Sequence, residues 1–129
     1  MNAAARRYAA TQNQTASPER MLVLLMEAAL RHIRTAASAL ERGERPKASE
    51  PLFKATEIVL ELLATLDRAR APQLCEQLAS VYEFVALRLT SAQNGGGAAP
   101  AREAERAFAP LAEAFAQAVA GQSAGAVAP

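Results

Sequence analysis

Apolar residues return every three or four positions along most of this chain, which is the period of an amphipathic α-helix. The pattern begins just after Ser17-Pro18, with the apolar run Met21-Leu22-Val23-Leu24-Leu25-Met26. The Ser17 hydroxyl can accept hydrogen bonds from first-turn amides. Pro18 loses nothing at the first helical position, where an N–H has no helical partner. These residues predict a long helix from Pro18 to about Arg42.

The same pattern predicts two further helices. The second runs from near Ser49 to about Asp67, with Pro51 in its first turn. Pro72 opens the third, and Asn94-Gly95-Gly96-Gly97 ends it. We interpret the three adjacent glycines as a linker, because neither a preceding strand nor a following Lys-Ser/Thr pair marks a phosphate-binding loop.

The end of the chain predicts a fourth helix and a tail. Pro100 opens this helix, and we expect Pro110 to kink or divide it because proline removes a helical hydrogen bond. Residues 1–14 have little apolar surface and predict a flexible arm, and residues 121–129 predict a disordered tail. The helical bundle is therefore expected over residues 15–120.

Each helix has one apolar stripe that is expected to face a shared core. Because short connections between long helices make neighbours antiparallel, the predicted fold is all-α, an antiparallel up-down bundle of four main helices with a flexible N-terminal arm. The expected core residues are Leu22, Leu25, Met26, Ala29, Ile33, Ala36 and Leu40 in the first helix, Ile58, Val59, Leu62, Leu63 and Leu66 in the second, Leu74, Leu78, Val81, Tyr82, Val85 and Leu89 in the third, and Ala104, Phe108, Leu111, Ala112, Phe115 and Val119 in the fourth.

The first three helices carry more apolar residues than one stripe requires. A helix that is apolar on two sides is normally buried on two sides, either by its neighbours in the bundle or by another chain. If the additional residues are exposed, they form grooves suited to an amphipathic helix or an extended apolar peptide. Burial in a homodimer is the alternative. The additional residues are Met21, Leu24 and Ala28 in the first helix, Leu60 and Ala64 in the second, and Phe84 and Leu87 in the third.

Charge and composition argue against several classes of partner. The net charge of +1, from 14 basic and 13 acidic residues, gives no electrostatic reason to expect nucleic acid or an anionic membrane. No apolar run reaches the length of about 18 residues that a membrane span needs, and no apolar signal segment precedes Thr15. We therefore expect a cytoplasmic protein that does not insert into a membrane.

Residues suited to catalysis are sparse. His32 is the single histidine and Cys75 the single cysteine, and we interpret both as structural, with Cys75 a small buried group. The Glu-x-x-His pattern of di-iron bundles is missing, and so is a nucleophile with its base. The chain is therefore not expected to be an enzyme or to bind a cofactor or a metal.

Several short motifs resemble the flagellin-specific export chaperones (FliS-like) in order and in near-constant spacing. That family opens with a tyrosine, continues with Thr-Ala-Ser/Thr-Pro and then has an aliphatic run. The resemblance extends from Tyr8 to about Val119. The motifs are Tyr8, Thr15-Ala16-Ser17-Pro18, Met21-Leu22-Val23-Leu24-Leu25-Met26 and Ala29-Leu30-Arg31, then Lys54-Ala55, Ile58-Val59, Glu61-Leu62 and Thr65-Leu66-Asp67, and finally Val81-Tyr82-Glu83-Phe84 and Arg88-Leu89.

The resemblance implies a cytoplasmic chaperone that binds the disordered C-terminal segment of flagellin, prevents premature polymerisation and delivers the subunit to the flagellar type III export gate. We expect the arm around Tyr8 to fold over the groove when no partner is bound, and the free chain to be a monomer or a weak homodimer. The alternative is a homodimeric regulatory or interaction protein of the flagellar system without a flagellin-binding role. The residues expected to bind the partner are Tyr8, Met21, Leu24, Ala28, Leu60, Ala64, Tyr82, Phe84 and Leu87.

Overall fold

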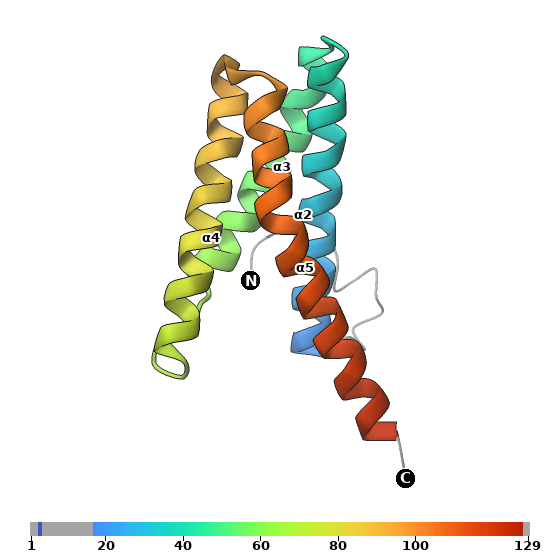
Figure 1. Cartoon of the computed structure of the whole chain (residues 1–129), viewed down its shortest axis with the longest axis vertical. Coiled ribbons are helices and arrows are strands. Elements are labelled where there is room, and N and C mark those ends of the chain that lie inside the picture. The colour runs from blue at the N-terminus through green and yellow to red at the C-terminus, as the bar shows by residue number, and fades with distance from the viewer. Residues whose placement is uncertain (1–2, 4–16, 128–129) are drawn as a thin grey trace.

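The structure, a computed structural model, describes residue 3 and residues 17–127, with side chains placed up to residue 122. Tyr8 and the rest of the predicted arm, apart from residue 3, lie outside the described residues. Residues 17–127 form four long helices and one π-helical turn (Figure 1). The elements are α2 (Pro18–Glu41), α3 (Arg45–Ala64), α4 (Pro72–Ser91), η1 (Ala92–Gly96) and α5 (Ala98–Val127).

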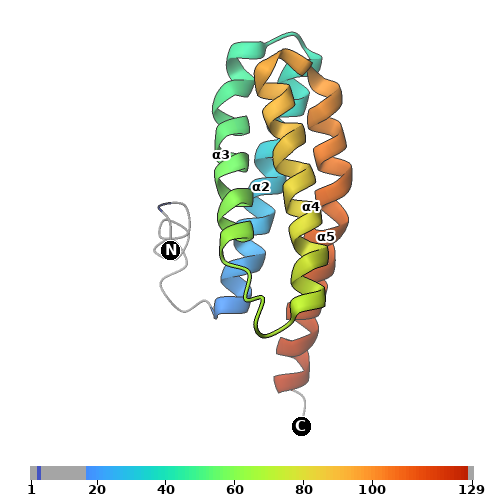
Figure 2. The same cartoon turned by 90° about the vertical axis from the view of Figure 1, so that its left-hand side faces the viewer.

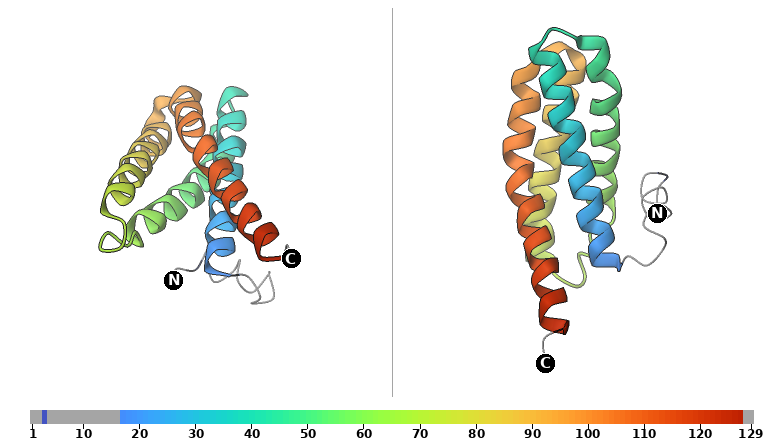
Figure 3. Two further views of the ribbon diagram at one scale, coloured as in Figure 1. Left: turned by 60° about the horizontal axis from the view of Figure 1, so that its bottom comes forward. Right: turned by 90° about the vertical axis from the view of Figure 1, so that its right-hand side faces the viewer.

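Successive helices run antiparallel, so the predicted all-α up-down bundle is confirmed (Figures 1 and 2). α2 packs against α3 and α5, and α4 packs against the same two helices. Figure 2 shows α3 and α4 side by side on one side of the molecule, and the right-hand view of Figure 3 shows α2 and α5 on the other. We name the outer surfaces between neighbours the α2–α3, α3–α4, α4–α5 and α2–α5 faces.

α2 begins and ends where the sequence predicts. The Ser17 Oγ accepts a hydrogen bond of 3.1 Å from the Arg20 amide, which satisfies one of the free donors of the first turn. The helix ends at Glu41, and Gly43 follows with a φ of 74°. This left-handed conformation favours glycine because residues with a Cβ rarely adopt a positive φ.

α3 begins earlier than predicted. The sequence favoured a start near Ser49 with Pro51 in the first turn, whereas the helix starts at Arg45 and has Pro51 inside it. Pro46 takes the position in the first turn where proline is tolerated. Pro51 comes early in the helix, and its ring removes one hydrogen bond without ending the helix. The helix ends at Ala64, three residues before the predicted end.

η1 and α5 differ from the prediction in three ways. The connection after α4 is a kinked turn, η1, whose backbone is non-helical at Asn94 and Gly95. Gly95 and Gly97 have φ values of 96° and 81°, which favour glycine. α5 continues through Pro110 as one helix, so Pro110 does not divide it. The helix also continues past residue 121, where the sequence predicted a tail, to Val127.

Within the described residues no helix is both long enough and apolar enough to span a bilayer.

The core lies along the axis of the bundle and is built from the predicted stripes. Leu74 is an exception to the predicted core, because it lies in the exposed first turn of α4 and is 51 % exposed. The largest side chains that are almost completely buried are Tyr82, Phe108, Met26, Ile33, Ile58, Leu89, Val59 and Val85.

Candidate partner-binding surface

The first turns of α2 and the last turns of α3 form a groove of about 260 Å³ on the α2–α3 face. Met21 lies in this groove and is half-buried against the core. Leu24 lies one turn further along α2 and is also half-buried, but it is not one of the apolar residues that pack against the core. The groove is mainly apolar, and its lining residues are Pro18, Met21, Leu22, Leu25, Glu61, Leu62 and Thr65.

α3 exposes apolar side chains on its outer surface. Leu60 is 48 % exposed, and Ala64 is exposed one turn later. Phe53, which the sequence analysis did not select, is 66 % exposed. It precedes Leu60 by seven residues, or about two turns, so it lies on the same side of α3. The spacing of seven residues between Phe53 and Leu60 is the sequence signal that identifies Phe53.

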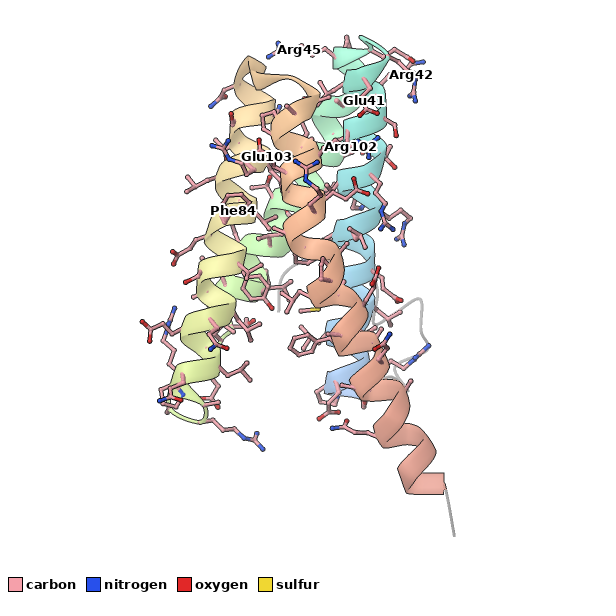
Figure 4. The ribbon with its side chains drawn as sticks, in the orientation of Figure 1. Glu41, Arg42, Arg45, Phe84, Arg102 and Glu103 are labelled. Atoms are coloured by element: carbon pink, nitrogen blue, oxygen red, sulfur yellow. The ribbon has the colours of Figure 1, made fainter. Side chains whose placement is uncertain are left out.

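α4 exposes Phe84 and Leu87, which lie off its predicted core stripe. Phe84 is 43 % exposed and Leu87 is 65 % exposed. Phe84 precedes Arg88 by one turn, and Arg88 pairs with Glu103 of α5 at 3.7 Å. Figure 4 labels Phe84 and Glu103 on these two helices. Phe84 therefore lies on the side of α4 that leans toward α5, whereas Leu87 lies about 60° further round the helix.

Ala28 and Tyr82 are corrections to the predicted surface, because both are in the core. Ala28 has no exposed surface, since α2 has neighbours on two sides and a small side chain permits close helix packing. Tyr82 is 2 % exposed, and its ring centroid lies 6.5 Å from that of Phe108 on α5. Burial raises the pKa of Tyr82 to about 12. Neither side chain is available to a partner in this structure.

The α2–α5 face is joined by alternating arginines and glutamates. Arg102 of α5 binds both carboxylate oxygens of Glu41 on α2, at 2.9 Å from Nε and 2.7 Å from Nη2. Its Nη1 donates to Glu105 at 2.9 Å, and Arg34 of α2 donates to the other oxygen of Glu105 at 2.8 Å. Figure 4 labels Glu41 and Arg102 on the neighbouring helices. Bidentate pairs of this kind fix geometry as well as adding stability.

These arginines lower the pKa of both glutamates. Hydrogen bonding by Arg102 holds the pKa of Glu41 below its usual value of 4.5. Burial would raise the pKa of Glu105, but hydrogen bonds from Arg34 and Arg102 outweigh burial and lower it. Because each pKa is lower in the folded chain than in the unfolded chain, the ionised carboxylates stabilise the fold at pH values above their usual pKa of 4.5. That stability is lost as pH falls through the folded pKa.

We expect Arg102→Met to lower the free energy of unfolding by roughly 1 kcal/mol near neutral pH, since methionine keeps an apolar stem but donates no hydrogen bond. The difference between the variant and the wild type should shrink in acid, where protonated carboxyls no longer bind the guanidinium strongly. Urea unfolding followed by circular dichroism at neutral pH and at about pH 3.5 measures both effects. Equal stability at neutral pH would contradict a stabilising role for these ion pairs.

Cys75 and His32, the single cysteine and the single histidine, lie among side chains that do not form a catalytic group in the described residues. Cys75 is buried, as predicted, and its Sγ donates to the Asp67 carbonyl at 3.2 Å. His32 is half-buried and lines a shallow pocket of about 390 Å³ together with Glu50 and Lys54 of α3. Among residues 3 and 17–127, no three or more His, Cys, Asp or Glu side chains are grouped so as to hold a metal ion.

The sequence of this bundle matches a known protein family. Residues 1–122 match the family described as flagellar protein FliS. The chain belongs to the FliS family. This is a family of chaperones and not of enzymes, so the expectation that the chain is not an enzyme is confirmed.

Individual relatives of this FliS-family chain match it over part of their length. The flagellar secretion chaperone FliSB of Pseudomonas aeruginosa is 33% identical over 81 residues, which cover 63% of this chain and 64% of the relative. The flagellar secretion chaperone FliS of Bacillus subtilis is 32% identical over 85 residues, or 66% of this chain and 62% of the relative. FliS of Vibrio cholerae is 26% identical over 84 residues, or 65% and 62%. The chain therefore spans less than two thirds of each relative.

Proposed function

We propose that this chain is a cytoplasmic export chaperone that binds the disordered C-terminal segment of flagellin. It would prevent premature polymerisation and assist delivery of the subunit to the flagellar type III export apparatus. FliS family membership and the relatives named flagellar secretion chaperones support this role. The observation that carries it is the exposure of large apolar side chains on α3 and α4, namely Phe53, Leu60, Phe84 and Leu87.

The shape of this surface suits an extended partner. Met21 and Leu24 on α2, Leu60 and Ala64 on α3, and Leu87 on α4 are spread over neighbouring helices instead of lining one deep cavity. A disordered segment can wrap such a surface through many shallow apolar contacts, although it loses conformational entropy when it becomes ordered. We propose that flagellin follows the α2–α3 groove and the exposed residues of α3 and α4.

The arm around Tyr8 has a place in the same proposal. The α2–α3 groove begins at Pro18, the first residue of α2, and the arm precedes this residue in the chain. The arm is therefore attached at one end of the groove, where it can act as the proposed cover in the absence of flagellin. Tyr8 itself lies outside the described residues.

Titration with the C-terminal segment of flagellin tests the function. Isothermal titration calorimetry with the full chain should show a one-to-one complex, with a negative heat-capacity change because apolar surface becomes buried. A peptide of the same composition in scrambled order is the control. Absence of binding to the flagellin segment, or equal binding to the scrambled peptide, would overturn the proposal.

Sedimentation velocity at several protein concentrations separates the chaperone from the alternative role. The same exposed residues, Phe53, Leu60, Phe84 and Leu87, would pair with a second copy if the chain were a homodimeric interaction protein. A free monomer that becomes a one-to-one complex with flagellin agrees with the chaperone. A stable dimer that does not change on addition of flagellin agrees with the alternative.

A further inference from the structure

The α3–α4 face carries the two most exposed large apolar side chains of the described residues, Phe53 and Leu87, together with Leu60. Phe53 and Leu60 come from α3 and Leu87 from α4, and they are 66 %, 48 % and 65 % exposed. Figure 2 looks onto this side of the bundle, where the two helices lie next to each other. Their positions on the face follow from the register of the helices.

Two hydrogen bonds link α3 and α4 at or just beyond their ends. At one end, Gln93 Nε2 donates to Ser49 Oγ at 3.1 Å. At the other end, Cys75 Sγ donates to the carbonyl oxygen of Asp67 at 3.2 Å. Asp67 lies in the connection after α3, so the contact between Ser49 and Gln93 sets the relative level of the two helices. Antiparallel α-helices rise equally per residue, so this level extends along the helices from that end.

This register places the three apolar side chains in two levels. Phe53 is level with Leu89, so Leu87 lies within about 3 Å of Phe53 along the helix axis. Leu60 lies about 10 Å further toward the connection between α3 and α4. A helical partner with apolar residues at positions i, i+3 or i+4, and i+7 presents a stripe of the same length.

The angular positions of the residues show which side of α3 and of α4 each apolar side chain occupies. Ser49 marks the side of α3 that faces α4, and Phe53 and Leu60 lie within about 40° of it. On α4, Arg88 marks the side that faces α5. Phe84 lies about 40° from Arg88 around the outer side of α4, and Leu87 lies about 100° from Arg88 in the same direction, which brings it nearer to α3.

The carboxylates around this apolar patch have no cationic partner in the described chain. Glu76 and Glu83 of α4 are exposed and lie between Leu87 and α3 in angular position, and Glu57 is half-buried on the outer side of α3. None of the three is in an ion pair with a described residue. The basic residues of α3 and α4 are engaged elsewhere: Lys47 with Glu44, Lys54 with Glu50, Arg88 with Glu103, and Arg45 with the Gln93 carbonyl.

We propose that the α3–α4 face binds a part of the flagellin segment that forms an amphipathic helix of about three turns, with Lys or Arg on both sides of its apolar stripe. This inference rests on the proposed function. The apolar stripe covers Phe53, Leu60 and Leu87, and the basic side chains pair with Glu57, Glu76 and Glu83. Charge complementarity selects this partner, because an acidic or neutral helix would leave the three carboxylates without a counter-charge.

A charge-neutral variant tests the electrostatic half of the inference. In Glu57→Gln/Glu76→Gln/Glu83→Gln the side chains keep their size and helix propensity, so circular dichroism should be unchanged. Affinity for the flagellin segment should fall about five- to thirtyfold at about 50 mM NaCl, as expected for three surface ion pairs. The difference should fade at about 500 mM NaCl, where surface charges are screened.

The matched control neutralises three other exposed glutamates. Glu19 and Glu27 of α2 and Glu113 of α5 are also outside any ion pair with a described residue. The variant Glu19→Gln/Glu27→Gln/Glu113→Gln has the same net charge as the test variant. Its affinity should fall much less than that of the test variant, because these residues lie on α2 and α5 and outside the α3–α4 face.

A second variant tests the apolar half. Phe53→Ala/Leu87→Ala removes two exposed side chains, so the fold should be retained. Affinity for the flagellin segment should fall, and the size of the loss should be the same at about 50 mM and about 500 mM NaCl, because salt does not screen apolar contacts. If the flagellin segment does not bind the wild type, the proposed function fails and this inference fails with it. If the wild type binds but the affinity of the charge-neutral variant is unchanged at low salt, the inference alone is overturned.

Discussion

Replacing Phe108 by alanine is expected to lower the free energy of unfolding by about 3–5 kcal/mol. Phe108 has no exposed surface and belongs to the core cluster shared by all four helices. Its ring lies 6.5 Å from the ring of Tyr82 on α4. Truncation would leave a cavity between α4 and α5, and the lost contacts would add to the lost transfer free energy.

Urea unfolding followed by circular dichroism measures this effect, and the chain offers a matched control. Phe53→Ala makes the same chemical change at a side chain that is 66 % exposed. It should alter stability by less than about 0.5 kcal/mol, because little surface is buried there. Similar losses in the two variants would contradict the placement of Phe108 in the core and Phe53 on the surface.

Leu24→Asp is expected to weaken binding of the flagellin segment roughly thirtyfold or more. Leu24 is half-buried and does not pack against the core, so the bundle should remain folded. In the proposed complex the aspartate would be desolvated among apolar side chains without a counter-charge, which is costly. Calorimetric titration gives the affinity, and circular dichroism gives the helicity of the variant.

Leu74→Asp is the control for this prediction. Leu74 is a leucine of α4 that is 51 % exposed and lies outside the proposed binding residues. The same change from leucine to aspartate there should leave affinity within about twofold of the wild type. Unchanged affinity in Leu24→Asp, or loss of its helical signal, would contradict the view that Leu24 lies on an accessible binding surface.

The two kinds of variant separate stability from binding. Core residues such as Phe108 hold the helices together, whereas Leu24, Leu60 and Leu87 add little to the packed interior. Exposed apolar side chains on a folded domain lower its solubility without stabilising it, so their presence on α3 and α4 agrees with a surface used by a partner. Substitutions there should affect affinity much more than stability.

Local sequence determined the helices of this bundle because helix formation depends on neighbouring residues. Ser17 and Pro18 specify the start of α2 through a side-chain hydrogen bond and a permitted proline. Proline was less informative in α3. Both Pro46 and Pro51 are acceptable near a helix start, and the structure uses Pro46. The spacing of three and four also identified most core residues, since it reports one side of each helix.

Which apolar residues stay exposed was decided by tertiary structure. The sequence shows that α2 is apolar on two sides, but only the packing of α2 against both α3 and α5 places Ala28 in the core. Tyr82 differs, because the spacing already placed it on the core stripe of α4, and the structure adds its contact with Phe108 of α5. Phe53 and Leu60 remain exposed because no described helix covers the α3–α4 face.

The sequence by itself therefore determined the all-α bundle, its core stripes and the surplus of apolar residues that points to a partner. Tertiary structure decided which of those residues reach the surface and which charges lie beside them. Leu60 of α3 comes to one face with Leu87 and Glu83 of α4 only because the two helices pack side by side. The reason is physical: periodicity describes one helix at a time, whereas exposure depends on side chains that are distant in sequence.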